Sequence, residues 1–462
     1  MLFNSYGFLF VFLPVVLTGY YSFGRWGARA ASAWIAAASL FFYAYWDVRY
    51  LPLLLGSAVW NLALSRRVAA SRGGVRRGWL AVGILGDVVL LGWYKYAGFF
   101  ARSLDELLHA SLPVPEVVLP VGISFFTFTQ IGYLVDVYRG TAGRVGALTY
   151  LEFVTVFPHL AAGPIISCRE VAPQLVAADR ARADYDHLAR GLLLLLSGLI
   201  KKAAVADAIA PWADAVFSSP AGVTTVEAWL GALAYTLQLY FDFSGYSEMA
   251  LGLALMLNLR FPLNFDGPYR ATSLIEFWRR WHMSLGLWVR DYLYIPLGGN
   301  RHGFLRQMGN LLVSMAVIGL WHGAGWTFVL WGVLHGVLLV VNHAWRRLGF
   351  SLPEPAGWCL TFLSVLCCWV FFRAADVGSA LSVLAAMAGQ AALVPAGAPR
   401  LPLVTCAGTL AALLVLVCTL PHPARFVPRL PLSRGVLAVF FVGGVYALLA
   451  VTQPSEFLYF RF

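Results

Sequence analysis

Charged residues are scarce in this chain of 462 residues. They make up 12% of the sequence, whereas hydrophobic residues make up 60% and the mean hydropathy is +0.73; an ordinary soluble domain carries roughly 25% charged residues. A surface this apolar could not remain in water, which excludes the roughly three soluble domains that length alone would suggest. We therefore predict an all-α polytopic integral membrane protein that forms a single membrane domain over residues 1–462.

Several motifs that would indicate other chemistries are also missing. The sequence contains no Gly-x-x-x-x-Gly-Lys-Ser/Thr phosphate loop, no His-Glu-x-x-His zinc motif and no Gly-x-Ser-x-Gly nucleophile elbow. Its six cysteines include no Cys-x-x-Cys pair, so neither a metal centre nor a disulfide framework is predicted. ATPase, metal hydrolase and serine hydrolase functions lose support, and no metal or bound cofactor is expected.

The net charge of +11 comes from basic residues in short loops between apolar runs. One such loop has no acidic residue and carries five arginines: Arg66, Arg67, Arg72, Arg76 and Arg77. Positive charge in short loops is typical of the cytoplasmic side of a membrane protein. We therefore expect the Arg66–Arg77 loop in the cytoplasm and, counting back across three spans, the N-terminus on the outer side of the membrane. We also expect the lipid bilayer as surroundings and no nucleic-acid partner.

Apolar runs predict eleven to thirteen transmembrane or re-entrant helices. A bilayer core of about 30 Å needs about 20 apolar residues per helix. No basic residue precedes Arg25, so the first run is expected to be a retained span and not a cleaved signal. Residues 148–166 contain Gly163 and Pro164 near their end and are expected to be interrupted. The interrupted segments need not each form a separate helix, so the predicted number is below the number of runs. The other runs cover residues 6–23, 31–46, 51–65, 79–100, 117–139, 188–210, 226–259, 308–322, 324–344, 357–373, 379–395, 402–420 and 434–452.

Two histidines stand in apolar, tryptophan-rich sequence. His322 lies in the run LWHG, and His282 ends the run FWRRWH. A buried imidazole costs free energy unless it has a partner or a function. We predict that His322 is a general base for a hydroxyl or thiol, and that His282 stabilises developing charge or assists proton transfer. The structural alternatives are a core histidine bonded to a carbonyl and an interfacial histidine; His335 is expected to be structural.

Two buried carboxylates and two arginines are further candidates for substrate or donor binding. Asp242 and Glu248 should face the protein interior, because carboxylates at membrane depth are costly. They would polarise a histidine or hold substrate, or else pair with Arg279 or Arg280. Guanidinium groups match phosphate geometry, so the two arginines would bind a nucleotide-bearing donor, unless they only extend to the cytoplasmic surface.

Two tryptophans complete the candidate set. Trp281 and Trp321 each precede one of the histidines and are predicted to line the same donor or substrate site.

Several stretches resemble the membrane-bound O-acyltransferase (MBOAT) family, and within it the bacterial branch that contains the alginate O-acetyltransferase membrane subunit. The resemblance extends over essentially the whole chain. The stretches are LPVGISFFTF at 119–128, FDFSGYS at 241–247, FWRRWH at 277–282, DYLYIPLGGN at 291–300, LWHGA at 320–324 and WVFFRA at 369–374.

This resemblance implies a multi-helix fold around a transmembrane tunnel, with an essential histidine at the position of His322. His282 matches a position where this bacterial branch carries histidine. The branch implies that acetyl-CoA, or another acyl thioester, donates the acyl group from the cytoplasm, and that a periplasmic acetyltransferase partner completes transfer onto a polysaccharide acceptor. One departure is His159, where a glutamine-like residue is expected; it leaves the substrate subgroup open.

The sequence thus favours an O-acetyltransferase of the bacterial cytoplasmic (inner) membrane that serves an exported or cell-wall polysaccharide. One alternative keeps the fold but transfers D-alanine or a longer acyl chain to teichoic acid or another acceptor. A second is a non-enzymatic transporter or scaffold. Transporters often show two hydropathy-related halves, and the sequence shows no such repeat.

Overall fold

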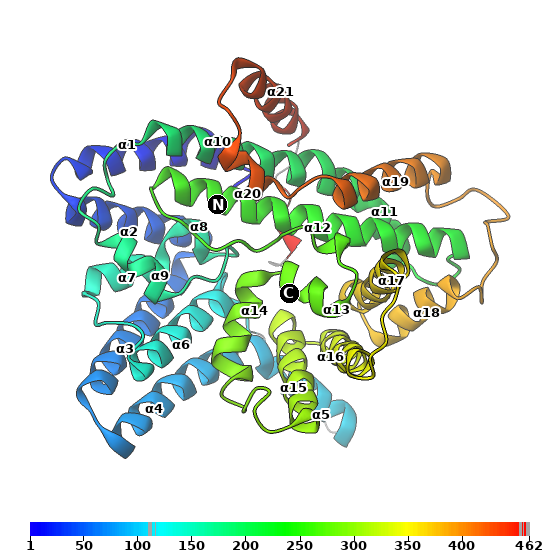
Figure 1. Ribbon diagram of the computed structural model, residues 1–462, viewed down its shortest axis with the longest axis horizontal. Coiled ribbons are helices and arrows are strands. Elements are labelled where there is room, and N and C mark those ends of the chain that lie inside the picture. The colour runs from blue at the N-terminus through cyan, green and yellow to red at the C-terminus, as the bar shows by residue number, and fades with distance from the viewer. Residues whose placement is uncertain (110–112, 116, 452–454, 456, 459–462) are drawn as a thin grey trace. The chain divides into compact units, whose positions relative to one another are not determined.

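Every secondary-structure element is helical in the part of the chain that the structure describes, which confirms the all-α prediction. The computed structural model describes residues 1–109, 113–115, 117–451, 455 and 457–458. The chain forms two compact units, Met1–Leu196 with Tyr246–Pro262, and Ser197–Gly245 with Leu263–Phe462. Figure 1 labels the α-helices along the chain. The prediction of a single membrane domain stays a prediction.

The first unit contains the N-terminal helices. They are η1 (Phe8–Phe12), α1 (Leu13–Gly24), α2 (Ala28–Ala44), η2 (Val48–Tyr50), α3 (Leu51–Ala70), α4 (Gly73–Leu91), η3 (Gly92–Tyr96), α5 (Ala97–Leu108), α6 (Ile123–Arg139), α7 (Ala147–Thr155), α8 (Phe157–Leu160), α9 (Cys168–Leu175) and most of α10 (Tyr185–Leu199). The segment 148–166 is interrupted as predicted, because α7 ends at Thr155 and the helical backbone stops again after Leu160.

The second unit contains both candidate histidines. Its helices are η4 (Ile200–Ala206), α11 (Asp207–Phe217), most of α12 (Thr225–Met256), η5 (Pro268–Arg270), α13 (Leu274–Arg280), α14 (Met283–Val289), η6 (Arg290–Tyr294), α15 (Phe304–His322), α16 (Trp326–Arg347), α17 (Glu354–Arg373), α18 (Val377–Met387), α19 (Leu403–Thr419), α20 (Pro423–Phe426), η7 (Val427–Arg429) and α21 (Arg434–Ala450).

Five helices among the described residues are long and apolar enough to cross a membrane: Gly73–Leu108, Phe304–His322, Trp326–Arg347, Glu354–Arg373 and Leu403–Arg429. Phe8–Gly24 and Arg434–Ala450 are apolar but shorter. These spans confirm a multi-pass membrane protein, and the total of eleven to thirteen stays a prediction.

One predicted span is wrong in its length. The run at 379–395 forms only α18, an 11-residue helix. The helix ends where Gly389 adopts a φ of 83°. A left-handed glycine after the last turn is a common helix stop.

Helices α15 and α16 form a tightly packed hairpin in the second unit (Figure 1). A Cβ atom added to Gly319 on α15 would collide with the carbonyl oxygen of Phe328, and one added to Gly332 on α16 would collide with that of Met315. Small residues allow membrane helices to approach backbone to backbone in this way. The close approach places Trp331 of α16 against His322 at the end of α15.

Candidate functional site

His282 occupies a sharp turn between two short helices. Its φ of 43° is left-handed, an uncommon conformation for a residue other than glycine. α13 begins with Ser273 as N-cap, whose hydroxyl accepts from the amide of Glu276 at 3.3 Å. After the turn, the Met283 amide donates to the Asn264 carbonyl at 2.9 Å. The turn therefore holds His282 in a fixed place, where its side chain is only 1% exposed.

His322 is the last residue of α15 and is buried beside His282. The two ring centres lie 6.2 Å apart. Trp321, Trp331 and Phe372 surround the His322 ring, with centre-to-centre distances of 4.9, 5.1 and 5.3 Å. Trp321 also lies 6.0 Å from His282. Two imidazoles at this separation can approach one small reacting group from two sides, and the aromatic wall limits the access of water.

His335 belongs to the next layer of aromatic rings. Its Nδ1 accepts from the indole N–H of Trp278 at 3.3 Å. Its ring lies 5.0 Å from Trp331, which in turn packs against His322. His335 thus contributes to the aromatic packing behind His322.

Asp242 pairs with a lysine and not with the arginines considered from the sequence. Its Oδ1 lies 2.5 Å from the Nζ of Lys202, and both side chains are buried. The pairing with Arg279 or Arg280 is therefore wrong for Asp242. Sequence reasoning missed Lys202 as a partner, although a lysine in a predicted span required an acidic neighbour.

Glu248 lies in the part of α12 that belongs to the first unit, whereas Asp242 lies in the second. The Glu248 side chain is fully buried, as expected for a carboxylate in an apolar run.

Arg280 is engaged in a local ion pair. Its guanidinium lies 2.7 Å from Glu276, one turn earlier on α13. Partial burial opposes ionisation of Glu276, but hydrogen bonds from Thr272 and the nearby Arg280 outweigh this effect and hold the pKa of the carboxyl below its ordinary value. Arg280 therefore pairs with Glu276 across one turn at the end of α13.

Trp281 is fully buried in an aromatic cluster. Its ring centre lies 4.9 Å from that of Trp369, 5.0 Å from that of Phe265 and 5.6 Å from that of Phe277. The indole therefore packs the turn that carries His282.

Arg279 lines a cavity of about 500 Å³ in the second unit. Polar side chains line part of this cavity: Trp278, Arg279, Arg290, Tyr294, Gln307 and His343. Met315 and Ile318 of α15 also line it, and Ile318 stands about one helical turn before His322. The cavity thus combines basic groups with an apolar wall on the helix that carries His322.

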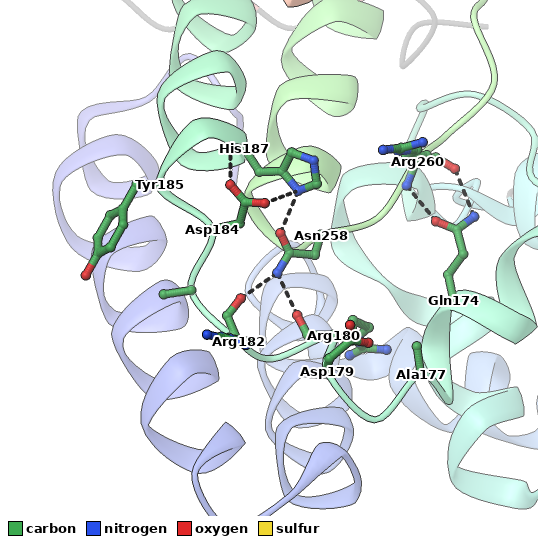
Figure 2. A pocket seen from close by; sticks show the side chains of 11 residues that line it. Gln174, Ala177, Asp179, Arg180, Arg182, Asp184, Tyr185, His187, Asn258 and Arg260 are labelled. Atoms are coloured by element: carbon green, nitrogen blue, oxygen red, sulfur yellow. Dashed lines mark hydrogen bonds and ion pairs between the residues drawn. The ribbon is translucent and has the colours of Figure 1, made fainter.

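A larger hollow of about 810 Å³ lies in the first unit (Figure 2). Its polar groups mostly bind one another. Asn258 Nδ2 donates to the carbonyls of Arg180 and Arg182 at 2.6 and 2.8 Å, and His187 Nδ1 donates to Asn258 Oδ1 at 2.8 Å. The Arg180 guanidinium is buried in an ion pair with Glu152. This network fixes the loop before α10.

No group of three or more His, Cys, Asp or Glu side chains within the described residues could hold a metal ion. His282 and His322 lie together among aromatic side chains in the second unit.

Comparisons with known proteins identify the family. A sequence model of the MBOAT, membrane-bound O-acyltransferase family, matches residues 134–361, a range that includes both histidines. The chain is 39% identical over 421 residues to the peptidoglycan O-acetyltransferase of Helicobacter pylori, covering 84% of this chain and 80% of that protein. It is 43% identical over 399 residues to a probable alginate O-acetylase AlgI of Azotobacter vinelandii, covering 84% and 78%.

A more distant relative transfers a different group. The chain is 29% identical over 238 residues to a teichoic acid D-alanyltransferase of Streptococcus thermophilus, covering 49% of this chain and 57% of that protein. Identity near 40% over most of both chains, together with the helical membrane fold, shows that this protein belongs to the membrane-bound O-acyltransferase family and is an acyltransferase.

Proposed function

We propose that this protein takes an acetyl group from a cytoplasmic thioester, acetyl-CoA, and passes it across the bacterial cytoplasmic membrane for O-acetylation of an exported or cell-wall polysaccharide. The observation that carries the proposal is the buried pair of His282 and His322, 6.2 Å apart within the family's matched region. The O-acetyltransferase names of the relatives with 39% and 43% identity support the acetyl group and the polymer acceptor.

In the proposed reaction, His322 removes the proton from the acceptor hydroxyl. The oxygen attacks the thioester carbonyl, and the tetrahedral intermediate then expels the thiolate, which takes up the proton held by His322. His282 stabilises the developing negative charge or assists the proton transfer. Donor and acceptor held together in an aromatic, water-poor pocket react as an oriented pair, and hydrolysis of the thioester is limited.

The cavity beside α15 is the proposed donor site. Arg279 and Arg290 would bind the phosphates of acetyl-CoA, because guanidinium groups pair well with phosphate oxygens, and His343 would donate a further hydrogen bond to them. The apolar wall at Met315 and Ile318 would carry the thioester arm toward His322.

The proposal also includes an orientation in the membrane and a partner protein. We place the Arg66–Arg77 loop in the cytoplasm and the N-terminus in the periplasm, in agreement with the basic loop. Residues 1–462 act as one membrane domain, and a periplasmic acetyltransferase completes transfer to the polysaccharide.

Transfer assays with purified protein in lipid vesicles test the donor. Vesicles that also hold the periplasmic acetyltransferase and the polysaccharide receive either acetyl-CoA labelled in the acetyl group or a carrier protein loaded with labelled D-alanine. Acceptor labelling from acetyl-CoA alone supports the proposal. Labelling from the D-alanyl carrier alone would replace it with the function named for the Streptococcus relative.

A further inference from the structure

Ser455 and Leu458, near the C-terminus, are held within the second unit by one lysine and two carboxylates. Lys202 Nζ lies 2.5 Å from Asp242 Oδ1 and 2.8 Å from Asp207 Oδ1. The second oxygen of each carboxylate binds the segment. Asp207 Oδ2 accepts from the Ser455 hydroxyl at 2.6 Å, and Asp242 Oδ2 accepts from the backbone N–H of Leu458 at 3.1 Å. A single cation thus orients two acceptors toward one stretch of chain.

This arrangement is costly as a means of stability alone. Lys202 and Asp242 are 4% and 1% exposed, and apolar residues often fill such positions with equal or greater stability. Both hydrogen bonds to the segment also join residues more than two hundred positions apart in the sequence. Directional bonds of this kind specify where a segment lies.

The segment reaches His282 through two phenylalanine rings. Phe457 is 1% exposed, and its ring centre lies 5.5 Å from that of Phe243. Phe243 follows Asp242 directly on α12, and its ring lies 4.7 Å from the His282 ring at an interplanar angle of 85°. The helical turn that binds Leu458 therefore also carries the ring that contacts His282.

We propose that Ser455, Phe457 and Leu458 form a positioning segment for His282. Lys202, Asp207 and Asp242 hold this segment, and Phe457 presses Phe243 against the His282 imidazole. The inference rests on the proposed function, because it concerns the part that His282 plays in acyl transfer. These residues act through His282 and do not touch the reacting atoms.

Ser455 gives the cleanest test of the anchor. Removing Lys202 would leave the buried Asp242 and the partly exposed Asp207 without this cation and would test folding more than positioning. The side chains of valine and threonine have nearly the same shape, so Ser455→Val and Ser455→Thr form a matched pair. Only threonine keeps the hydroxyl that binds Asp207. We expect Ser455→Val to lower kcat by roughly tenfold with an unchanged KM for acetyl-CoA. Loss of a hydrogen bond to a charged group weakens the binding of Ser455 to Asp207 by about that factor or more, so the segment is correctly placed less often. Ser455→Thr should retain most of the activity. Equal kcat values for the two variants would contradict the proposal that the hydrogen bond between Ser455 and Asp207 positions the segment.

A double-mutant cycle then tests the route through His282. In the wild-type background, Phe457→Leu should reduce kcat by roughly tenfold, as small displacements of catalytic groups do. In a His282→Asn background, the same change should have almost no further effect, because the group that it positions is gone. The control is Phe217→Leu, a buried ring on α11 that packs against Tyr235 and should behave alike in both backgrounds.

The outcomes separate the two proposals. Multiplicative losses from Phe457→Leu and His282→Asn would overturn the positioning role and leave the proposed function intact. Wild-type activity of His282→Asn by itself would instead overturn the role of His282 in acyl transfer.

Discussion

The imidazole rings of His282 and His322 lie 6.2 Å apart although they come from different helical elements. His282 owes its place to a left-handed turn between α13 and α14, and His322 to the end of α15 against α16. The site therefore depends on two kinds of local structure, a strained turn and a close helix hairpin. Each can be disturbed separately.

The glycine contact between α15 and α16 should be necessary for activity. Gly319→Ala would place a methyl group against the carbonyl of Phe328, so the helices must separate near His322. We expect a loss of about 1–3 kcal/mol in unfolding free energy, as in other overpacked sites, together with reduced acetyl transfer. Gly309→Ala on the same helix is the matched control, since nothing lies within 4 Å of its added methyl group. Thermal unfolding in detergent and transfer assays measure both effects, and equal behaviour of the two variants would refute the close-packing account.

The two neighbouring arginines should differ in their effect on the donor. Arg279→Gln removes a basic group from the cavity beside α15 and should raise the KM for acetyl-CoA by roughly tenfold with little change in kcat. Arg280→Gln breaks a local pair with Glu276 and should change this KM much less. Steady-state kinetics over a range of acetyl-CoA concentrations distinguish the two. A larger KM effect for Arg280→Gln than for Arg279→Gln would contradict the placement of the donor phosphates in this cavity.

Asn258 should tolerate glycine better than alanine. Its φ of 56° is left-handed, and its side chain binds the Arg180 and Arg182 carbonyls and His187 (Figure 2). Both substitutions remove these hydrogen bonds, but only alanine adds the steric cost of this conformation, about 1–2 kcal/mol. Asn258→Gly should therefore unfold at a higher temperature than Asn258→Ala, the reverse of the usual order within a helix. An alanine variant as stable as the glycine variant would show that the backbone relaxes there.

The sequence predicted the helical membrane fold because composition and the length of apolar runs determine it largely without tertiary detail. It also predicted the interruption before Pro164, since proline and glycine break the backbone hydrogen bonding of a helix locally. The predicted length of the span at 379–395 was wrong because apolar residues continue past Gly389, where the backbone already turns.

The site was predicted only in its residue types. The burial cost of an imidazole singled out His282 and His322, but their separation depends on the turn at His282 and on the packing of α15, which no local pattern specifies. The need of Asp242 for a cation was also foreseeable. Its choice of Lys202 over Arg279 or Arg280 depends on tertiary packing. The contact of Phe457 with Phe243 joins distant segments and left no local signal.

The most direct test of the central claim is acetyl transfer by His322→Asn, assayed with labelled acetyl-CoA in lipid vesicles. Asparagine approximates the size of imidazole but cannot act as a base, so label should no longer reach the acceptor while protein yield and thermal stability stay unchanged. His302→Asn, an exposed histidine before α15, should transfer label as the wild type does. Wild-type transfer by His322→Asn would contradict the account.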